Sequence, residues 1–147
     1  MILRELETIK AVCESNSNIE FSIVLCGDFN SQPSYGVYEF INNKVIDENH
    51  PDWKSIEGEH VENLKIEHSV NMKSACGTPK YTTYTMGFKG CLDYIFYQSD
   101  TVSVKNVIPF PTEEELSQFE GLPNLVYPSD HLACVADMKW KIPEVFQ

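Results

Sequence analysis

Apolar residues recur at helical spacing at the start of the chain. Five of them would lie on one face of a helix: Ile2, Leu3, Leu6, Ile9 and Val12. This spacing predicts a helix over residues 1–14, ended by the polar stretch SNSN. The next apolar run, FSIVL, is continuous rather than periodic, and it predicts a buried strand over residues 20–26.

A second helix is predicted over Tyr35–Asn42, where Ser34 is positioned as the N-cap. The segment Lys44–Ile46 is short enough to be either a strand or a loop. Residues 47–63 carry many charges with weak periodicity, which is typical of a surface excursion.

The second half of the chain has a sequence pattern typical of strands. Strands are predicted over 80–85, 91–97, 102–108 and the second half of PSDHLACVADMKW, with a turn at MGFKG. Thr112 and Glu115 form a capping-box pattern that opens a helix over 113–119. Mixed helices and strands followed by clustered strands predict an α/β (α+β) layered fold.

Length and composition set limits on function. With 147 residues the chain suffices for one ordinary domain, and its apolar runs are too short to span a membrane. A net charge of −11 is unusual for a protein that holds nucleic acid by neutralising phosphates. Three explanations remain open: a substrate that is not a polyanion, a bound cation that supplies the positive charge, or a solvated acidic face over 47–67 and 113–120.

The 5 cysteines are scattered and form no CxxC pair. This usage predicts reduced core thiols in a reducing compartment and no disulfide-linked partner.

Candidate chemistry lies at strand ends. Asp28 and Asn30 follow the first predicted strand in CGDFN, and Asp130 and His131 precede the last one in SDH. Asp93 lies in the apolar strand CLDYIFY, where a carboxylate needs a partner, and a histidine is the natural one.

Structural alternatives exist for each of these positions. Asp28 and Asn30 are ordinary turn formers, Asp93 could accept backbone hydrogen bonds, and Asp130 and His131 could be surface or capping residues. The remaining histidines lie in or beside the charged excursion and are interpreted as structural: His50, His60 and His68.

In this order and spacing, GDFN, LDYIF and SDH resemble the endonuclease/exonuclease/phosphatase superfamily. The stretches YTTYT, GFKGCLDYIFY, IPFPTEEEL and PSDHLACVADMKWK look like its deadenylase branch, and SACG and GCLDYIF look most like the mitochondrial 2′,5′-phosphodiesterases. The resemblance covers about residues 20–141.

The resemblance implies a four-layer sandwich built from two similar halves. Residues 1–147 match only the C-terminal half, so the N-terminal half, with the principal metal-binding glutamate, is expected to be absent. Met1 is accordingly expected to be an internal methionine or a misassigned start.

The resemblance also implies roles for the site residues and a Mg²⁺ cofactor, with Mn²⁺ as an alternative. Asp28 would be the general base, Asn30 would bind the phosphate, and His131 would contact the attacked phosphate with Asp93 behind it as orienter. Asp28, Asn30 and Asp130 would be the metal ligands that this chain supplies.

Substrate contacts are implied for the turn GFKG. Phe88 would stack on adenine, although it could also be a core aromatic, and Lys89 could contact a phosphate. Thr83 stands where relatives have asparagine, a change that could alter substrate preference.

The implied activity is a metal-dependent phosphodiesterase or 3′-exonuclease that releases AMP from poly(A) RNA and 2′,5′-oligoadenylate. The alternatives are a 3′,5′ deadenylase or phosphatase, a phospholipid or inositol-phosphate hydrolase, and a non-catalytic truncated module. The fragment alone is expected to be inactive. The resemblance implies a location in the mitochondrial matrix, with the cytoplasm as the alternative.

Overall fold

A three-stranded antiparallel sheet forms the centre of the protein in a computed structural model that describes residues 2–17 and 19–141. Its strands are β1 (Val24–Asp28), β7 (Asp93–Gln98) and β4 (Met72–Ser74), in the order β1-β7-β4. Each residue of β1 from Val24 to Asp28 lies opposite one residue of β7, and this register places Asp28 directly opposite Asp93.

The two faces of this sheet differ, because successive side chains of a strand point to opposite sides. Along β7, Tyr94 and Phe96 are fully buried, whereas Asp93, Ile95 and Tyr97 are only half-buried. One face therefore belongs to the hydrophobic core, and the other is open to chemistry.

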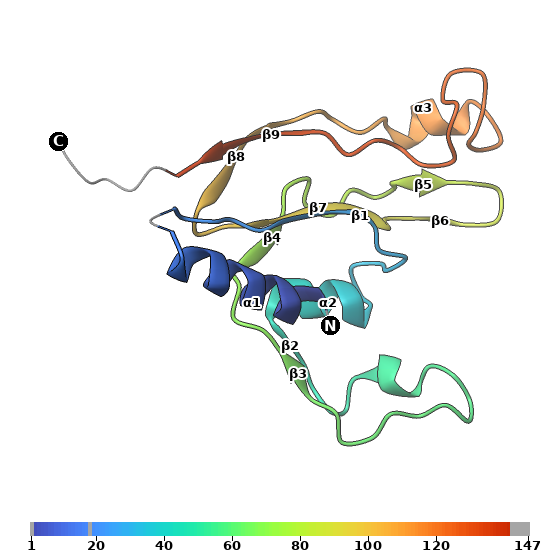
Figure 1. The fold of residues 1–147 in the computed structure, drawn as a ribbon. Coiled ribbons are helices and arrows are strands. Elements are labelled where there is room, and N and C mark those ends of the chain that lie inside the picture. The colour runs from blue at the N-terminus through green and yellow to red at the C-terminus, as the bar shows by residue number, and fades with distance from the viewer. Residues whose placement is uncertain (1, 18, 142–147) are drawn as a thin grey trace.

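Helices α1 (Ile2–Ser15) and α2 (Gly36–Asn43) cover the core face of the sheet (Figure 1). Phe40 and Ile41 of α2 pack in one cluster with Leu3 and the buried side chains of β7. The predicted helix 1–14 is confirmed over its described residues; Met1 lies outside them.

The apolar face predicted for α1 is only partly used. Leu3 is buried and Leu6 packs at the edge of the core, but Ile2, Ile9 and Val12 are exposed. The helix contacts the sheet near its N-terminal end, so the periodicity predicted more burial than the structure contains.

The predicted cap at Ser34 is wrong. The structure begins α2 at Gly36 with Tyr35 as the N-cap residue. The Gly36 amide donates to Asp52 Oδ2 at 2.6 Å, and the Tyr38 amide donates to Ser31 Oγ at 3.3 Å. A carboxylate brought from 16 residues away replaces the local cap.

An arm formed by residues 47–65 projects from the helical side between the short paired strands β2 (Val45–Ile46) and β3 (Ile66–Glu67) (Figure 1). It contains the 3₁₀ helix η1 (Pro51–Lys54) and is mostly exposed, as predicted for residues 47–63. The Trp53 indole N–H donates to the Asp47 carbonyl at 2.8 Å and fixes the base of the arm.

Two further antiparallel pairs lie on the open side of the sheet. The hairpin β5 (Thr83–Tyr84) and β6 (Lys89–Gly90) and the ribbon β8 (Val102–Val107) and β9 (Ala136–Trp140) run beside it (Figure 1). The short helix α3 (Glu113–Ser117) begins with the predicted capping box of Thr112 and Glu115. A second core cluster joins these parts: Tyr84, Leu116, Leu122 and Leu132.

Several predicted strands are displaced or shorter. The strand predicted as buried over 20–26 is β1, which runs from Val24 to Asp28 and is largely exposed on its outer face. The strand predicted over 80–85 is reduced to β5. All five cysteines are free, but only Cys91 is buried and Cys26 is exposed, so the description as core thiols is wrong for most of them.

Among the helices in residues 2–17 and 19–141, none combines the length and the apolar character needed to cross a membrane.

Candidate active site

Asp28 is the last residue of β1 and lies beside the first residue of β7, Asp93. The glycine before it has a φ of +150°, in a region that side-chain-bearing residues rarely adopt. Gly27 therefore lets the strand change direction at the point where the Asp28 carboxylate leaves the sheet.

The loop after Asp28 is held by local hydrogen bonds. The Asn30 amide donates to Asp28 Oδ1 at 2.8 Å, and Asn30 has a positive φ of 47°, as expected of an Asx turn. The Phe29 amide donates to the Leu92 carbonyl at 2.8 Å and so ties the loop to β7. Asp28 is thus a turn former, and within residues 2–17 and 19–141 its carboxylate accepts this hydrogen bond through Oδ1 alone.

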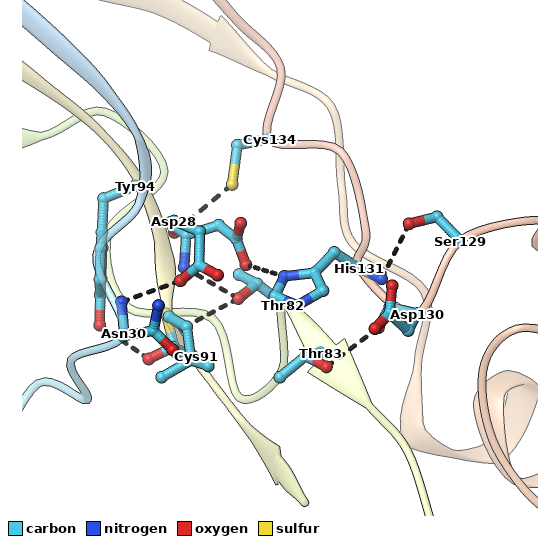
Figure 2. A network of polar contacts seen from close by, with 12 residues as sticks. Asp28, Asn30, Thr82, Thr83, Cys91, Tyr94, Ser129, Asp130, His131 and Cys134 are labelled. Carbon is cyan, nitrogen blue, oxygen red and sulfur yellow. Dashed lines mark hydrogen bonds and ion pairs between the residues drawn. The ribbon is translucent and has the colours of Figure 1, made fainter.

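Asp93 and His131 form a hydrogen-bonded pair, as expected for this strand carboxylate. The distance between His131 Nδ1 and Asp93 Oδ2 is 2.8 Å (Figure 2). An ionised carboxylate only accepts hydrogen bonds, so Nδ1 carries the proton and Nε2 faces away from Asp93. Asp93 begins β7 and is half-buried, with 18% of its side chain exposed.

The electrostatic surroundings stabilise the charged imidazole. The hydrogen bond to Asp93 raises the pKa of His131 above its ordinary value, and partial burial opposes this only in part. The negative charges of Asp93, Asp28 and Asp130 raise the pKa further. His131 is therefore suited to contact an anionic group.

The structure brings three of the predicted site residues together. One ligand atom from each of Asp28, Asp93 and His131 lies within 4.8 Å of the other two. These side chains line an open cavity between the sheet and the segment before β9, together with Ser129 and Cys134. Asn30 joins the group through its hydrogen bond to Asp28.

The donor set fits a hard divalent cation. Asp28 and Asp93 each offer a carboxylate oxygen, and Mg²⁺ is commonly held by one or two carboxylates with water and phosphate oxygens completing its shell. A cation here would lie against an open cavity rather than in a closed cage of protein ligands.

Asp130 lies beside this group rather than in it. Its carbonyl accepts a hydrogen bond of 3.0 Å from Thr83 Oγ1, and its side chain is exposed. Its charge reaches His131, since it contributes to the raised pKa of that residue. The three-residue ligand group of the described chain contains Asp93 where Asp130 was expected.

Phe88 lies close to the Asp28 loop. Its ring packs over Gly90, where the Gln32 side chain also approaches, and the residue is 41% exposed. This position on the hairpin leaves one part of the ring accessible, which a fully core aromatic would not have.

The Lys89 side chain packs on Tyr84. Its Nζ lies 3.8 Å from the centre of the Tyr84 ring, a cation–π contact. Thr83 is 3% exposed and its hydroxyl is bound to Asp130, so an effect of this residue on substrate choice would act through Asp130 and His131.

Several supporting residues were not found from the sequence. The Ser129 hydroxyl accepts the His131 amide at 3.1 Å, and the Tyr94 hydroxyl lies 2.8 Å from the Ser31 carbonyl. Thr82 accepts the Asp93 amide at 3.1 Å (Figure 2). The Tyr94 and Thr82 contacts join separate segments of the chain, for which a sequence carries no local signal, whereas Ser129 lies only two residues before His131.

Comparison with known proteins agrees with this arrangement. Residues 10–131 match the model of the Endonuclease/Exonuclease/phosphatase family. The chain is 49% identical over 119 residues to 2′,5′-phosphodiesterase 12 of Homo sapiens, covering 81% of this chain and 20% of that protein. It is 37% identical over 127 residues to the CCR4-Not complex 3′-5′-exoribonuclease subunit Ccr4 of Schizosaccharomyces pombe, covering 84% and 18%.

Two solved structures share the fold. The crystal structure of ANGEL2, a 2′,3′-cyclic phosphatase in complex with adenosine-2′,3′-vanadate, superposes with a TM-score of 0.72 at 23% identity, over 94% of this chain and 49% of that one. The human nocturnin catalytic domain gives a TM-score of 0.57 at 23% identity, over 95% and 38%.

The chain thus spans about a fifth of the curated relatives it matches and about half of the ANGEL2 chain. The sequence match extends over most of the residues that form the sheet, the hairpin and the Asp28–Asp93–His131 cluster. The mixed α/β fold is the one found in ANGEL2 and nocturnin. On these grounds the chain belongs to the endonuclease/exonuclease/phosphatase family.

Proposed function

We propose that the protein containing this chain is a divalent-metal-dependent phosphodiesterase that hydrolyses adenylate chains and releases AMP. The observation that carries this proposal is the cluster of Asp28, Asp93 and His131, with the Asp93–His131 hydrogen bond of 2.8 Å. It combines a carboxylate base with an imidazole whose raised pKa favours contact with a phosphate.

In the proposed reaction, water attacks phosphorus in line with the leaving sugar oxygen. The Asp28 carboxylate takes a proton from the water as the new O–P bond forms, and the bridging P–O bond breaks, with the leaving sugar oxygen taking a proton from solvent water. His131 Nε2–H donates to a phosphate oxygen, while Asp93 holds the ring by Nδ1. The Asn30 side-chain amide is proposed to donate to another phosphate oxygen as negative charge develops.

Mg²⁺, with Mn²⁺ as an alternative, is the proposed cofactor. When bound, it would neutralise the negative charge of the phosphate. A chain of net charge −11 has few positive side chains to do this. We propose Asp28 of the cluster and Asn30, which follows it in the same loop, as ligands, with Asp130 contributing directly or through water; Asp93, the second carboxylate of the cluster, holds His131. The donor set supports a hard cation without defining which one.

Adenine recognition is proposed for Phe88. Stacking of a base on an aromatic ring contributes about 1–3 kcal/mol, and the partial exposure of Phe88 next to Gln32 supports this use. Lys89 is a weaker candidate for phosphate contact, because its ammonium group already lies on Tyr84.

The substrate class draws support from the relatives. One is named a 2′,5′-phosphodiesterase and another a 3′-5′-exoribonuclease, so both linkages of oligo- and polyadenylate RNA are proposed substrates. The mitochondrial matrix is the proposed location, with the cytoplasm as the alternative.

We further propose that residues 1–147 correspond to the C-terminal half of one sandwich domain. The coverage of 49% of the ANGEL2 chain supports this proposal. The isolated 147-residue chain is then expected to be inactive, because the principal metal-binding glutamate would come from the other half.

The test uses the longer protein with Asp28→Asn. Release of AMP from 2′,5′-linked triadenylate and from 3′,5′-linked oligoadenylate is measured in Mg²⁺. We expect kcat to fall by about 10²–10⁴-fold, as for loss of a general base. Asp47→Asn, the same change at an exposed carboxylate in the arm, is the matched control.

An unmodified protein that cleaves neither linkage would refute the proposal. Cleavage of 3′,5′ links alone would reassign the chain to a 3′,5′ deadenylase. Turnover by the isolated chain that disappears in Asp28→Asn would refute the half-domain proposal while leaving the site intact.

A further inference from the structure

Thr82 lies beneath the start of β7 and is completely buried, with an exposed fraction of 0%. Its hydroxyl oxygen accepts two backbone amides, from Leu92 at 2.9 Å and from Asp93 at 3.1 Å. Backbone amides of a strand usually donate to carbonyl groups of a neighbouring strand. Here the Thr82 hydroxyl accepts them instead.

The backbone of Thr82 holds the opposite partner of the site. Its carbonyl accepts the Leu132 amide at 2.7 Å, one residue after His131, and its own amide donates to the Gly90 carbonyl at 2.8 Å. One buried residue therefore fixes the backbone beside both members of the Asp93–His131 pair.

The next residue extends this connection. Thr83 forms an isolated β-bridge with His131, and its hydroxyl donates to the Asp130 carbonyl at 3.0 Å (Figure 2). The hairpin β5–β6 thereby links the segment before β9 to the central sheet. Two further polar contacts between these segments are the Asp93–His131 hydrogen bond itself and a long contact of 3.5 Å between Cys134 Sγ and the Asp93 carbonyl.

We propose that Thr82 is a positioning residue, whose hydroxyl sets the distance and orientation of Asp93 relative to His131. Its effect on the reaction rests on the proposed function; its effect on the pair does not. Valine has the same shape but accepts no hydrogen bond, so it would leave two amides in the interior without their acceptor. The start of β7 would then move toward another acceptor, and the 2.8 Å contact of Asp93 with His131 would loosen.

The experiment compares Thr82→Val with Thr82→Ser in the longer protein. Serine keeps the hydroxyl and loses only a methyl group. Thr101→Val, a threonine in the turn after the far end of β7, is the matched control. kcat per folded molecule and KM are measured separately on 2′,5′-linked triadenylate. The folded fraction is determined for each variant, because a loss of folded protein alone would also lower the apparent kcat at unchanged KM.

A second measurement needs no activity. In ¹⁵N-histidine-labelled protein, the proton between His131 Nδ1 and Asp93 Oδ2 is expected to give a low-field resonance, which is assigned by its loss in His131→Gln. The Thr82→Val change should broaden or remove it, and Thr82→Ser should retain it.

For Thr82→Val we expect kcat to fall by about 10²-fold with KM within twofold, since a misplacement of about 1 Å has effects of this size. Thr82→Ser and Thr101→Val should stay within about threefold of the unmodified protein. If Thr82→Val does not fold, Thr82→Cys takes its place, because its sulfur is a weak acceptor, and the same direction is expected.

The proposal is overturned if the valine protein keeps both its kcat and the low-field resonance, or if serine and valine impair them equally. A protein that cleaves no adenylate at all would refute the proposed function, but the resonance in the valine and serine proteins would still decide whether Thr82 positions the pair.

Discussion

The two faces of β7 differ in what covers them and in what their side chains do. On one face, Tyr94 and Phe96 are buried under α1 and α2 and stack on each other with ring centres 5.0 Å apart. On the other, Asp93 and Ile95 remain half-buried, and Asp93 meets His131. Adjacent residues of β7 therefore point alternately to the hydrophobic core and to the candidate active site.

This contrast shows how a chain with little deep burial keeps its charged groups in place. The apolar face supplies the rigidity, because Phe29 packs edge-on against Tyr94 and Phe96 while its neighbour Asp28 lines the cavity. Substitutions on the two faces should therefore affect different measurements.

The largest effect is expected for His131→Asn, on the open face. The asparagine amide lies near the position of Nδ1 and keeps a donor for Asp93, but it lacks Nε2. We expect kcat for adenylate cleavage to fall by about 10²–10⁴-fold, with the free energy of unfolding changed by less than about 0.5 kcal/mol. A large loss of stability in urea unfolding would show that the two faces are not separable.

Phe96→Ala tests the covered face. Removing a fully buried ring should lower the free energy of unfolding by about 3–5 kcal/mol, through lost burial and the cavity left behind. Among molecules that remain folded, kcat should change far less than in His131→Asn. Denaturant unfolding together with active-site titration of the folded fraction measures both quantities.

Tyr94→Phe removes one hydroxyl from the same face. Burial raises the pKa of this phenol well above its ordinary value, so it remains a proton donor at all physiological pH values. It lies 2.8 Å from the Ser31 carbonyl and 2.9 Å from the Cys91 carbonyl, and its loss should cost about 1–2 kcal/mol. An unchanged unfolding free energy would mean that the loop after Asp28 is held by other contacts.

Glu7→Gln should have the smallest effect, and one that depends on pH. Partial burial raises the pKa of Glu7, but hydrogen bonds from the Ser69 hydroxyl and amide outweigh it, so the folded-state pKa lies below 4.5. The stabilisation, about 1 kcal/mol, is present above pH 4.5 and is lost as the pH falls through the lowered pKa.

Unfolding measured from pH 7 to pH 3 should therefore show the two proteins converging at the acid end. Glu5→Gln on the same helix, a change at an exposed carboxylate, is the control. A constant difference between Glu7 and its glutamine variant across this range would contradict the prediction.

The site was predictable where chemistry and local pattern coincide. Asp93 in an apolar strand requires a partner, and the partner found is a histidine from SDH. The alternation of β7 and the capping box at Thr112 are equally local, and both are present. Such features depend on residues that are close together in the sequence, so they can be recognised without knowing the fold.

Other features depend on residues brought together only by folding. The amide of Gly36 is satisfied by Asp52 rather than by Ser34, and Lys89 lies on Tyr84 rather than facing the cavity. Thr82 serves Asp93 from 11 residues away and Leu132 from much farther along the chain. Neither spacing nor residue type distinguishes these partners from many equivalent threonines, aspartates and aromatic residues.

The indole of Trp53, fixed to the Asp47 carbonyl at the base of the arm, has a spectroscopic consequence. The chain has 2 tryptophans, and the other, Trp140, is 60% exposed on β9, on the opposite side of the sheet (Figure 1). Emission from Trp140→Phe would report on the arm alone, and emission from Trp53→Phe on the ribbon alone. Each side of the molecule thus carries its own intrinsic fluorophore, and the order in which the two sides melt is open to direct optical measurement.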